Sequence, residues 1–280
     1  MFQSGLVVRA TMVVSLLGGV LTAQSESGAP GVLRPARPAG AELPELVTDR
    51  PDFTESTEVV GKGVFQMESG FTVARSQGGS SLSGPELLMR VGLSKRLELR
   101  FGGDGFLRER TPGGESFTGR SDSELAMKIR LFDQGRYRPA LSLIPIVSAP
   151  VGSAYFSSGG YDPTVKVALG KDLARGFSVG GNVNFSSLNT PQGRFRQTAW
   201  SASLGHDVGR GFGAYWEVFG FVPWDKDGSA AWLANTGISR SIGKNVQFDV
   251  RVGKSLTDSG PNWFWGMGMA VRQPAWGFFR

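Results

Sequence analysis

Residues 246–272, which read VQFDVRVGKSLTDSGPNWFWGMGMAVR, contain two runs in which apolar residues alternate with polar or small ones. The apolar positions are Val246, Phe248, Val250 and Val252 in the first run, and Trp263, Trp265, Met267, Met269 and Val271 in the second. A period of two is typical of a pleated strand, whose successive side chains point to opposite faces. Each run has about the ten residues that a tilted strand needs to cross a bilayer. The stretch therefore predicts a transmembrane hairpin.

The same alternation continues through most of the chain after residue 63. It predicts about twelve strands, at 64–75, 86–93, 97–107, 121–131, 137–148, 161–171, 176–187, 195–207, 211–222, 229–239, 246–255 and 262–272. Every other connection is short and basic, namely 94–96, 133–136, 172–175, 208–211 and 243–245. The connections between them are longer and rich in Gly, Ser and Pro, for example 109–120, 150–160 and 189–194. Bacterial outer-membrane barrels have short periplasmic turns, longer outer loops and an even strand count. We therefore expect an all-β protein, a closed antiparallel transmembrane β-barrel over residues 64–272.

Alternation alone does not say which face of the sheet lies inside. A soluble secreted barrel or sandwich, with its apolar face inward, would show the same pattern and is the alternative. Three features favour the membrane barrel: a secretory signal, polar faces rich in Gly, Ser and Asn, and tryptophans near the predicted outer strand ends, where an interfacial girdle lies. These tryptophans are Trp224, Trp232, Trp263 and Trp265.

The chain before the barrel divides into three parts. Residues 1–23 are predicted to be a signal peptide, because Arg9 precedes a short apolar run that ends in small residues. A buried N-terminal helix is the alternative interpretation. Residues 24–45 are rich in Pro and Ala and predict a flexible leader, because such a composition buries too little apolar surface to fold alone. Residues 46–63 follow as a charged pre-barrel segment.

The charged segment and the last hairpin resemble a known family. The residues that carry the resemblance are LVTDRPDFTES at 46–56, GKGVFQMESGF at 61–71, and DSGPNWF at 258–264 followed by Gly266 and Gly268. They resemble the family of MetA-pathway phenol-degradation proteins, often called outer-membrane transporters, and the likeness covers residues 46–272. The resemblance implies an outer-membrane barrel and points toward hydrophobic or aromatic compounds as solutes.

The polar faces of the predicted strands carry charges of both signs. These are Glu68, Arg90, Glu98, Arg100, Glu124, Lys128, Arg130, Lys166, Glu217, Asp249 and Arg251. They are assigned to the lumen because an Arg or Lys on the lipid side of mid-strand would cost about 2–4 kcal/mol. Such a lining could select a polar solute, or it could brace the barrel through ion pairs, and we favour bracing for most of these residues. The near balance of signs argues against a strongly ion-selective pore.

The charged segment could also fold into the lumen as a plug. Its candidate residues are Asp49, Arg50, Asp52, Phe53 and Glu55, whose charges would then meet those of the wall. The alternative is a simple periplasmic lead into the first strand.

Composition excludes several kinds of site. The 280 residues contain no Cys and a single His, so a cysteine or histidine metal site is not expected, nor is a cofactor. The net charge of +6 is spread along the chain and does not indicate nucleic-acid binding. His206 is the one possible imidazole base of a hydrolase. It lies beside Asp207 at the predicted periplasmic end of its strand, whereas hydrolysis of outer-leaflet lipid would need it at the opposite rim.

The expected function is passive transport of a small solute through the outer membrane, without enzymatic activity. The alternatives are a structural or adhesive barrel and, third, an outer-membrane lipid hydrolase. The expected partners are outer-membrane lipid and the solute, and we expect a monomer because no strand face is typical of a subunit interface. Residues 273–280 form an aromatic tail in which Pro274 should stop strand pairing.

Overall fold

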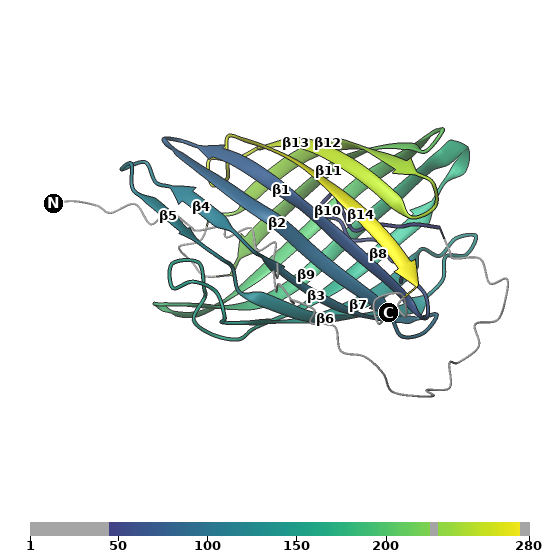
Figure 1. Ribbon diagram of the computed structural model, residues 1–280, viewed down its shortest axis with the longest axis horizontal. Helices are drawn as coiled ribbons and strands as arrows, with labels where there is room; N and C mark the ends of the chain where they lie inside the picture. The colour runs from purple at the N-terminus through teal and green to yellow at the C-terminus, as the bar shows by residue number, and fades with distance from the viewer. Residues whose placement is uncertain (1–44, 225–228, 275–280) are drawn as a thin grey trace, which may run out of the picture.

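The computed structural model describes residues 45–224 and 229–274, and nearly all of its regular structure is β-strand (Figure 1). The elements in chain order are β1 (Val64–Ser76), β2 (Gly79–Gly92), β3 (Leu97–Asp104), β4 (Leu107–Arg110), β5 (Ser116–Gly119), β6 (Ser123–Phe132), β7 (Ala140–Ala149), β8 (Asp162–Asp172), the 3₁₀ turn η1 (Ala174–Gly176), β9 (Phe177–Thr190), β10 (Gly193–Gly209), β11 (Phe212–Pro223), β12 (Ala231–Ile242), β13 (Val246–Ser255) and β14 (Trp263–Pro274). In this part of the chain, no helix is both long and apolar enough to cross a membrane.

Twelve of these strands close into a barrel. Each strand pairs antiparallel with its neighbour in the order β1-β14-β13-β12-β11-β10-β9-β8-β7-β6-β3-β2, and β2 pairs with β1 to complete the ring. Closure leaves no unpaired edge, which is the condition for a sheet to lie in hydrocarbon. The predicted closed antiparallel barrel is confirmed. The short strands β4 and β5 form a hairpin that pairs with the outer part of β2, and it projects at the left end of Figure 1.

The outward face of the barrel is apolar and the inward face is polar. In β6, Leu125 is 51% exposed, while Lys128 has no exposed surface. Exposed apolar side chains cover the outside of the other strands as well, among them Val165, Leu169, Val183, Phe185, Phe248, Val250, Val252, Met267 and Met269. A soluble barrel would show the opposite distribution, because water would favour the charges outside. The protein is therefore an outer-membrane β-barrel.

The connections alternate in length, with exceptions. At the end where β1 begins, the turns 93–96, 173–176, 210–211 and 243–245 are short. The connection 133–139 at the same end has seven residues and is longer than the predicted turn 133–136. The opposite end carries the connections 105–122, 150–161, 224–230 and 256–262, which identifies it as the outer end. The longer loop predicted at 189–194 is wrong, and the gap between the predicted strands 64–75 and 86–93 is also mostly strand. The connection at each place is a two-residue turn, 77–78 or 191–192.

These two differences have one cause. The start of β2 is rich in Gly and Ser and contains Pro85, so it lacks the apolar alternation used to find strands. Backbone pairing with β1 nevertheless continues to the pair Ser76 and Gly79, with a bulge near Gly70. The ends of β9 and β10 likewise pair through Thr190 and Gly193 beyond their apolar alternation. The expected loop 109–120 contains most of the β4–β5 hairpin.

The end of the barrel also differs from the prediction. Pro274 pairs with Val64 as the last residue of β14, so the strand continues two residues beyond Arg272. A proline is tolerated there because the ladder ends at that residue. The predicted signal peptide, the predicted leader up to residue 44, residues 225–228 and the tail from residue 275 lie outside the described residues.

Candidate functional site in the barrel interior

The segment 46–63 enters the barrel and leaves it at the same end. Thr48 accepts a hydrogen bond from Gln247 at the start of β13, with 2.8 Å between Oγ1 and Nε2. Gly63 donates its N–H to the carbonyl of Gly92, at the end of β2, over 2.8 Å. Between these points the segment contacts inward-facing side chains of most of the wall. It therefore forms a loop inside the barrel, anchored on both sides near the short periplasmic turns.

Asp49 is the centre of a buried ion network. Its Oδ2 atom lies 2.7 Å from Nζ of Lys128, 2.9 Å from a guanidinium nitrogen of Arg100 and 3.3 Å from one of Arg90. These four side chains are at most 4% exposed. The other oxygen, Oδ1, accepts hydrogen bonds from N–H and Oγ of Ser56, both over 2.8 Å. One carboxylate thus connects β2, β3 and β6 to both sides of the loop.

Two wall carboxylates complete this network. Arg90 pairs with Glu68 and with Glu98, at 2.9 Å in each case. Glu68 also accepts the backbone N–H of Asp49 over 2.9 Å, and Glu98 accepts that of Val60 over 2.8 Å. The buried cations are therefore offset by carboxylates from both the wall and the loop. Charges buried in this way are tolerated only when they are paired and hydrogen-bonded.

Arg50 forms the second attachment, to the opposite side of the wall. Its guanidinium lies 2.5 Å from Glu86 and 3.5 Å from Asp249. It passes over Gly70 of β1 and Gly268 of β14, where a Cβ atom would overlap it. The small residues on the inward face of β14 thus make room for the side chain of Arg50.

Arg251 of β13 supports the same side of the loop. One of its guanidinium nitrogens donates to the carbonyl of Pro51 over 2.6 Å, and another donates to Thr72 of β1 over 2.8 Å. Arg251 also lies 3.9 Å from Glu86. The Glu86 carboxylate therefore contacts both Arg251 of the wall and Arg50 of the loop.

Glu217 of β11 holds the apex of the loop. It accepts the backbone N–H groups of Phe53 over 2.9 Å and of Thr54 over 2.6 Å, and also the hydroxyl of Thr54 over 2.6 Å. Asn235 donates to the same carboxylate over 2.6 Å. Hydrogen bonds to a charged acceptor contribute about 1.5–3 kcal/mol each. This side chain is therefore a strong attachment point for the loop.

An apolar cluster lies beside the apex. The ring of Phe53 stacks on that of Phe219 with centroids 4.7 Å apart, and it meets Phe221 edge-on at 5.3 Å. Ala231 and Leu233 of β12, Phe264 of β14 and Ala74 of β1 also belong to the cluster. The inner wall is therefore aromatic beside the apex of the loop, and it is charged where it faces the rest of the loop.

The returning side of the loop is bound to β6, β7 and β8. Glu55 pairs with Arg100 and Lys166, and Glu58 pairs with Arg130. Ser142 donates to the carbonyl of Thr57 over 2.7 Å. Most of the wall charge is thus engaged by the loop or by its neighbours.

Comparison with known proteins identifies the family of this chain. The model of the family described as "Putative MetA-pathway of phenol degradation" matches residues 48–273. The chain belongs to this family. The resemblance expected from its sequence motifs is therefore confirmed. No curated protein matches the sequence.

Solved structures share the fold of this family member at low sequence identity. The COG4313 outer membrane channel from Pseudomonas putida F1 superimposes with a TM-score of 0.53 and 15% identity, over 78% of this chain and 98% of that one. The NanC porin gives 0.50 and 8%, over 74% and 98%. These likenesses support the outer-membrane barrel architecture.

The predicted wall residues of this MetA-pathway family member converge on the loop. Those that contact it are Glu68, Arg90, Glu98, Arg100, Lys128, Arg130, Lys166, Glu217, Asp249 and Arg251. Glu124 lies half-buried on the inward face of β6 near its outer end, opposite Gly102 and Ser148. Of the predicted loop residues, Asp49, Arg50, Phe53 and Glu55 contact the wall as described. Asp52 accepts a 3.3 Å hydrogen bond from Ser203.

The tryptophans lie on the outward face near the outer strand ends. Trp224, Trp263 and Trp265 are 56%, 43% and 37% exposed. Trp232 is half-buried against Trp200, with ring centroids 4.4 Å apart. These positions suit an interfacial girdle, which stays a prediction. His206 lies near the periplasmic turn 210–211, with its ring stacked on Phe177 at 4.2 Å.

Sequence reasoning missed two acidic partners. Glu86 lies on the inward face of β2, four residues from Arg90, so the period of two could have placed it there. Glu58 lies in the returning side of the loop, outside any strand, and no periodic signal marks it.

Proposed function

We propose that the protein is a passive outer-membrane channel and that residues 46–63 are its plug. The observation that carries this proposal is the loop itself, which crosses the interior and engages charges from most of the wall. Family membership supports it, and so do the names of the superimposable proteins, an outer membrane channel and a porin. On this proposal the described conformation is closed, and a solute passes when the plug shifts.

Most wall charges act as attachment points for the plug on this proposal. Asp49, Glu55 and Glu58 offset cations of the wall, while Glu68, Glu98 and Glu217 accept backbone groups of the plug. Selectivity would then depend less on net charge than on the aromatic cluster beside the apex. That cluster favours a small hydrophobic or aromatic solute, as the family description also suggests.

A reversible crosslink tests the role of the plug. The hydroxyl oxygens of Thr54 and Ser201 lie 2.7 Å apart, and the chain has no native Cys, so Thr54→Cys/Ser201→Cys can form a single disulfide. The measurement is planar-bilayer current before and after reduction. We expect the oxidised protein to be closed and the reduced protein to show discrete openings, with each single variant as a control. Equal currents in both states would show that the plug does not gate the channel.

We also propose that the barrel has no hydrolytic activity. His206 stacks on Phe177 at the periplasmic rim, far along the strand from the outer end. A lipid-hydrolysis assay of the wild type and of His206→Ala tests this proposal. Activity that disappears in the variant would contradict it.

A further inference from the structure

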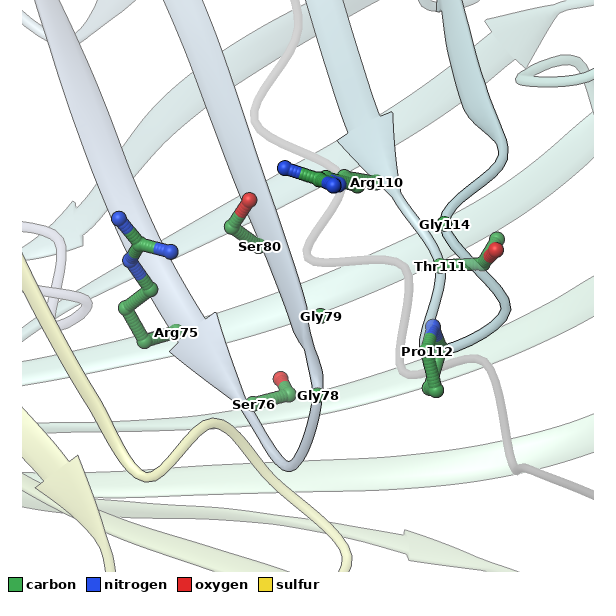
Figure 2. A pocket seen from close by; sticks show the side chains of 9 residues that line it. All are labelled: Arg75, Ser76, Gly78, Gly79, Ser80, Arg110, Thr111, Pro112 and Gly114. Carbon is green, nitrogen blue, oxygen red and sulfur yellow. The ribbon is translucent and has the colours of Figure 1, made fainter.

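A row of polar side chains crosses the outer rim on the lipid-facing side of the wall. Strand pairing places Arg75 of β1 between Trp263 of β14 and Ser80 of β2, and Ser80 is opposite Arg110 of β4. Directly opposed residues in an antiparallel sheet point to the same face. Since Trp263 is on the exposed outer surface, both arginines face away from the lumen. Figure 2 shows Arg75, Ser80 and Arg110 side by side on three strands.

The row borders a cavity of about 290 Å³. Its lining includes Arg75, Ser76, Ser80, Arg110 and Thr111, together with glycines of the adjoining turns. Both arginines are exposed, and among the described residues neither guanidinium has a hydrogen-bond or ion-pair partner. Arginine forms bidentate hydrogen bonds with phosphate, and serine hydroxyls donate to the same group. The cavity thus offers a cradle for a phosphate.

In the next row toward the middle of the membrane, the residues of β14, β1 and β2 are apolar, and the residue of β4 is basic. Val73 of β1 lies between Trp265 of β14 and Leu82 of β2, and Leu82 is opposite Arg108. This row faces outward like the first one. A ligand that binds both rows would need an anionic head at the rim and an apolar tail below it.

The β4–β5 hairpin is held so that its arginines face outward. On its opposite face, Phe117 of β5 stacks on Tyr155 of the loop 150–161, with ring centroids 3.8 Å apart. Glu109 is opposite Phe117 and shares that inner face. The nearest acidic residue of β4 therefore points away from the arginine row.

We propose that Arg75 and Arg110, with Ser80 between them, bind the phosphate of an anionic lipid headgroup in the outer leaflet of the outer membrane. The acyl chains of this lipid lie over Val73, Leu82 and Trp265. A free phosphate ion would not contact these apolar residues. Contact with them therefore distinguishes a lipid headgroup from a free phosphate ion. The proposal does not depend on transport through the lumen.

The same combination occurs elsewhere on the outer rim. A second cavity, of about 240 Å³, is lined by Arg196 together with Trp224, Phe185 and Val165. Phe185, Val165 and Trp224 are exposed on the outward face. A basic side chain beside exposed apolar ones therefore occurs at a second place on the outer rim, as expected for a wall that contacts anionic lipid.

The test is a lipid-binding titration of the full-length refolded protein in a neutral detergent, read by native mass spectrometry. The probes are lipid A with two phosphates, the same lipid with its phosphates removed, and inorganic phosphate. We expect Arg75→Gln/Arg110→Gln to bind the phosphorylated lipid at least about tenfold more weakly than the wild type. The double variant Arg75→Lys/Arg110→Lys, which keeps both charges, should recover most of the binding. Lys95→Gln/Arg136→Gln removes two exposed charges at the opposite rim and should leave the affinity unchanged.

Several results would overturn the proposal. Equal binding of phosphorylated and dephosphorylated lipid would exclude recognition of the phosphate. Inorganic phosphate that competes at concentrations similar to those of the lipid would indicate a free-anion site. Equal loss of binding in the Lys95→Gln/Arg136→Gln control would indicate a non-specific charge effect.

The fold of each variant is checked on SDS gels. A heat-dependent shift that each variant retains would show that the barrel remains closed.

Discussion

Asp49→Asn is the most informative substitution in the plug, because it removes one charge and almost no volume. Asparagine can keep the Oδ1 hydrogen bonds to Ser56, so the loop retains its internal contacts. Around the Oδ2 atom, however, Lys128, Arg100 and Arg90 lose the carboxylate that lies 2.7–3.3 Å from them. Glu55 also pairs with Arg100 and with Lys166, so the native network has four acids (Asp49, Glu55, Glu68, Glu98) and four bases, and the substitution leaves three acids and four bases.

The expected magnitude follows from the cost of an unpaired buried charge. Removing one partner of a buried ion pair costs about 3–5 kcal/mol. At about 1.4 kcal/mol per factor of ten, this shifts the equilibrium between docked and undocked plug by about 100- to 4,000-fold. The barrel itself should stay closed, because its strands pair independently of the loop. The variant should therefore fold and conduct.

The assay is single-channel open probability in planar bilayers, with Asp172→Asn as the matched control. Asp172 is exposed at the periplasmic end of β8, where its carboxylate accepts a hydrogen bond from Gln134 of a periplasmic turn. Exposed substitutions of this kind change stability by about 0.5 kcal/mol or less, so this control should match the wild type. If Asp49→Asn gave the open probability of the wild type while folding normally, the network would not hold the plug and our reasoning would be wrong.

Three further predictions concern other parts of the barrel. Gly268→Ala places a Cβ where the Arg50 guanidinium lies, so the variant should increase conductance, and unchanged currents would contradict the path of Arg50 between β1 and β14. Phe53→Ala removes the ring stacked on Phe219 and should destabilise the docked plug by about 3–5 kcal/mol, measured as faster proteolysis of the segment 46–63 in the folded protein; equal cleavage rates would argue against this anchor. Met127→Arg places a cation on the lipid side of β6 and should lower the free energy of unfolding from lipid vesicles by about 2–4 kcal/mol, whereas a change below about 1 kcal/mol would indicate that this face does not contact the hydrocarbon.

The fold was largely predictable because a membrane barrel has a simple local code. The alternation of Leu125, Met127 and Leu131 with Lys128 and Arg130 is a property of neighbouring residues, and it defines both the strand and its faces. The start of β2 was not predictable in this way, because Gly79, Ser80 and Ser81 pair through their backbone and carry no apolar pattern. Such segments are recognised only from the partner strand.

The interior was predictable in composition but not in pairing. Periodicity places Glu68, Arg90 and Lys128 on inward faces, yet it cannot say which charge meets which across a closed sheet. Asp49 joins residues 41, 51 and 79 positions away along the chain, in three different strands. The charge density of the segment suggested a plug. No local sequence pattern predicts that Glu217, which is 163 residues from Thr54, binds the apex of the loop.

The placement of both loop anchors at one rim has a mechanical consequence. A pull on the loop from the periplasmic side would load its hydrogen bonds and ion pairs one after another, starting at Thr48, as in unzipping. A push from the outer side would meet the apex at Glu217 and load the attachments together, in shear. Since the two sides of the loop run back to the same opening, it can be withdrawn without threading a chain end through the barrel. The closure should therefore be weak to force applied from within the cell and strong to force applied from outside.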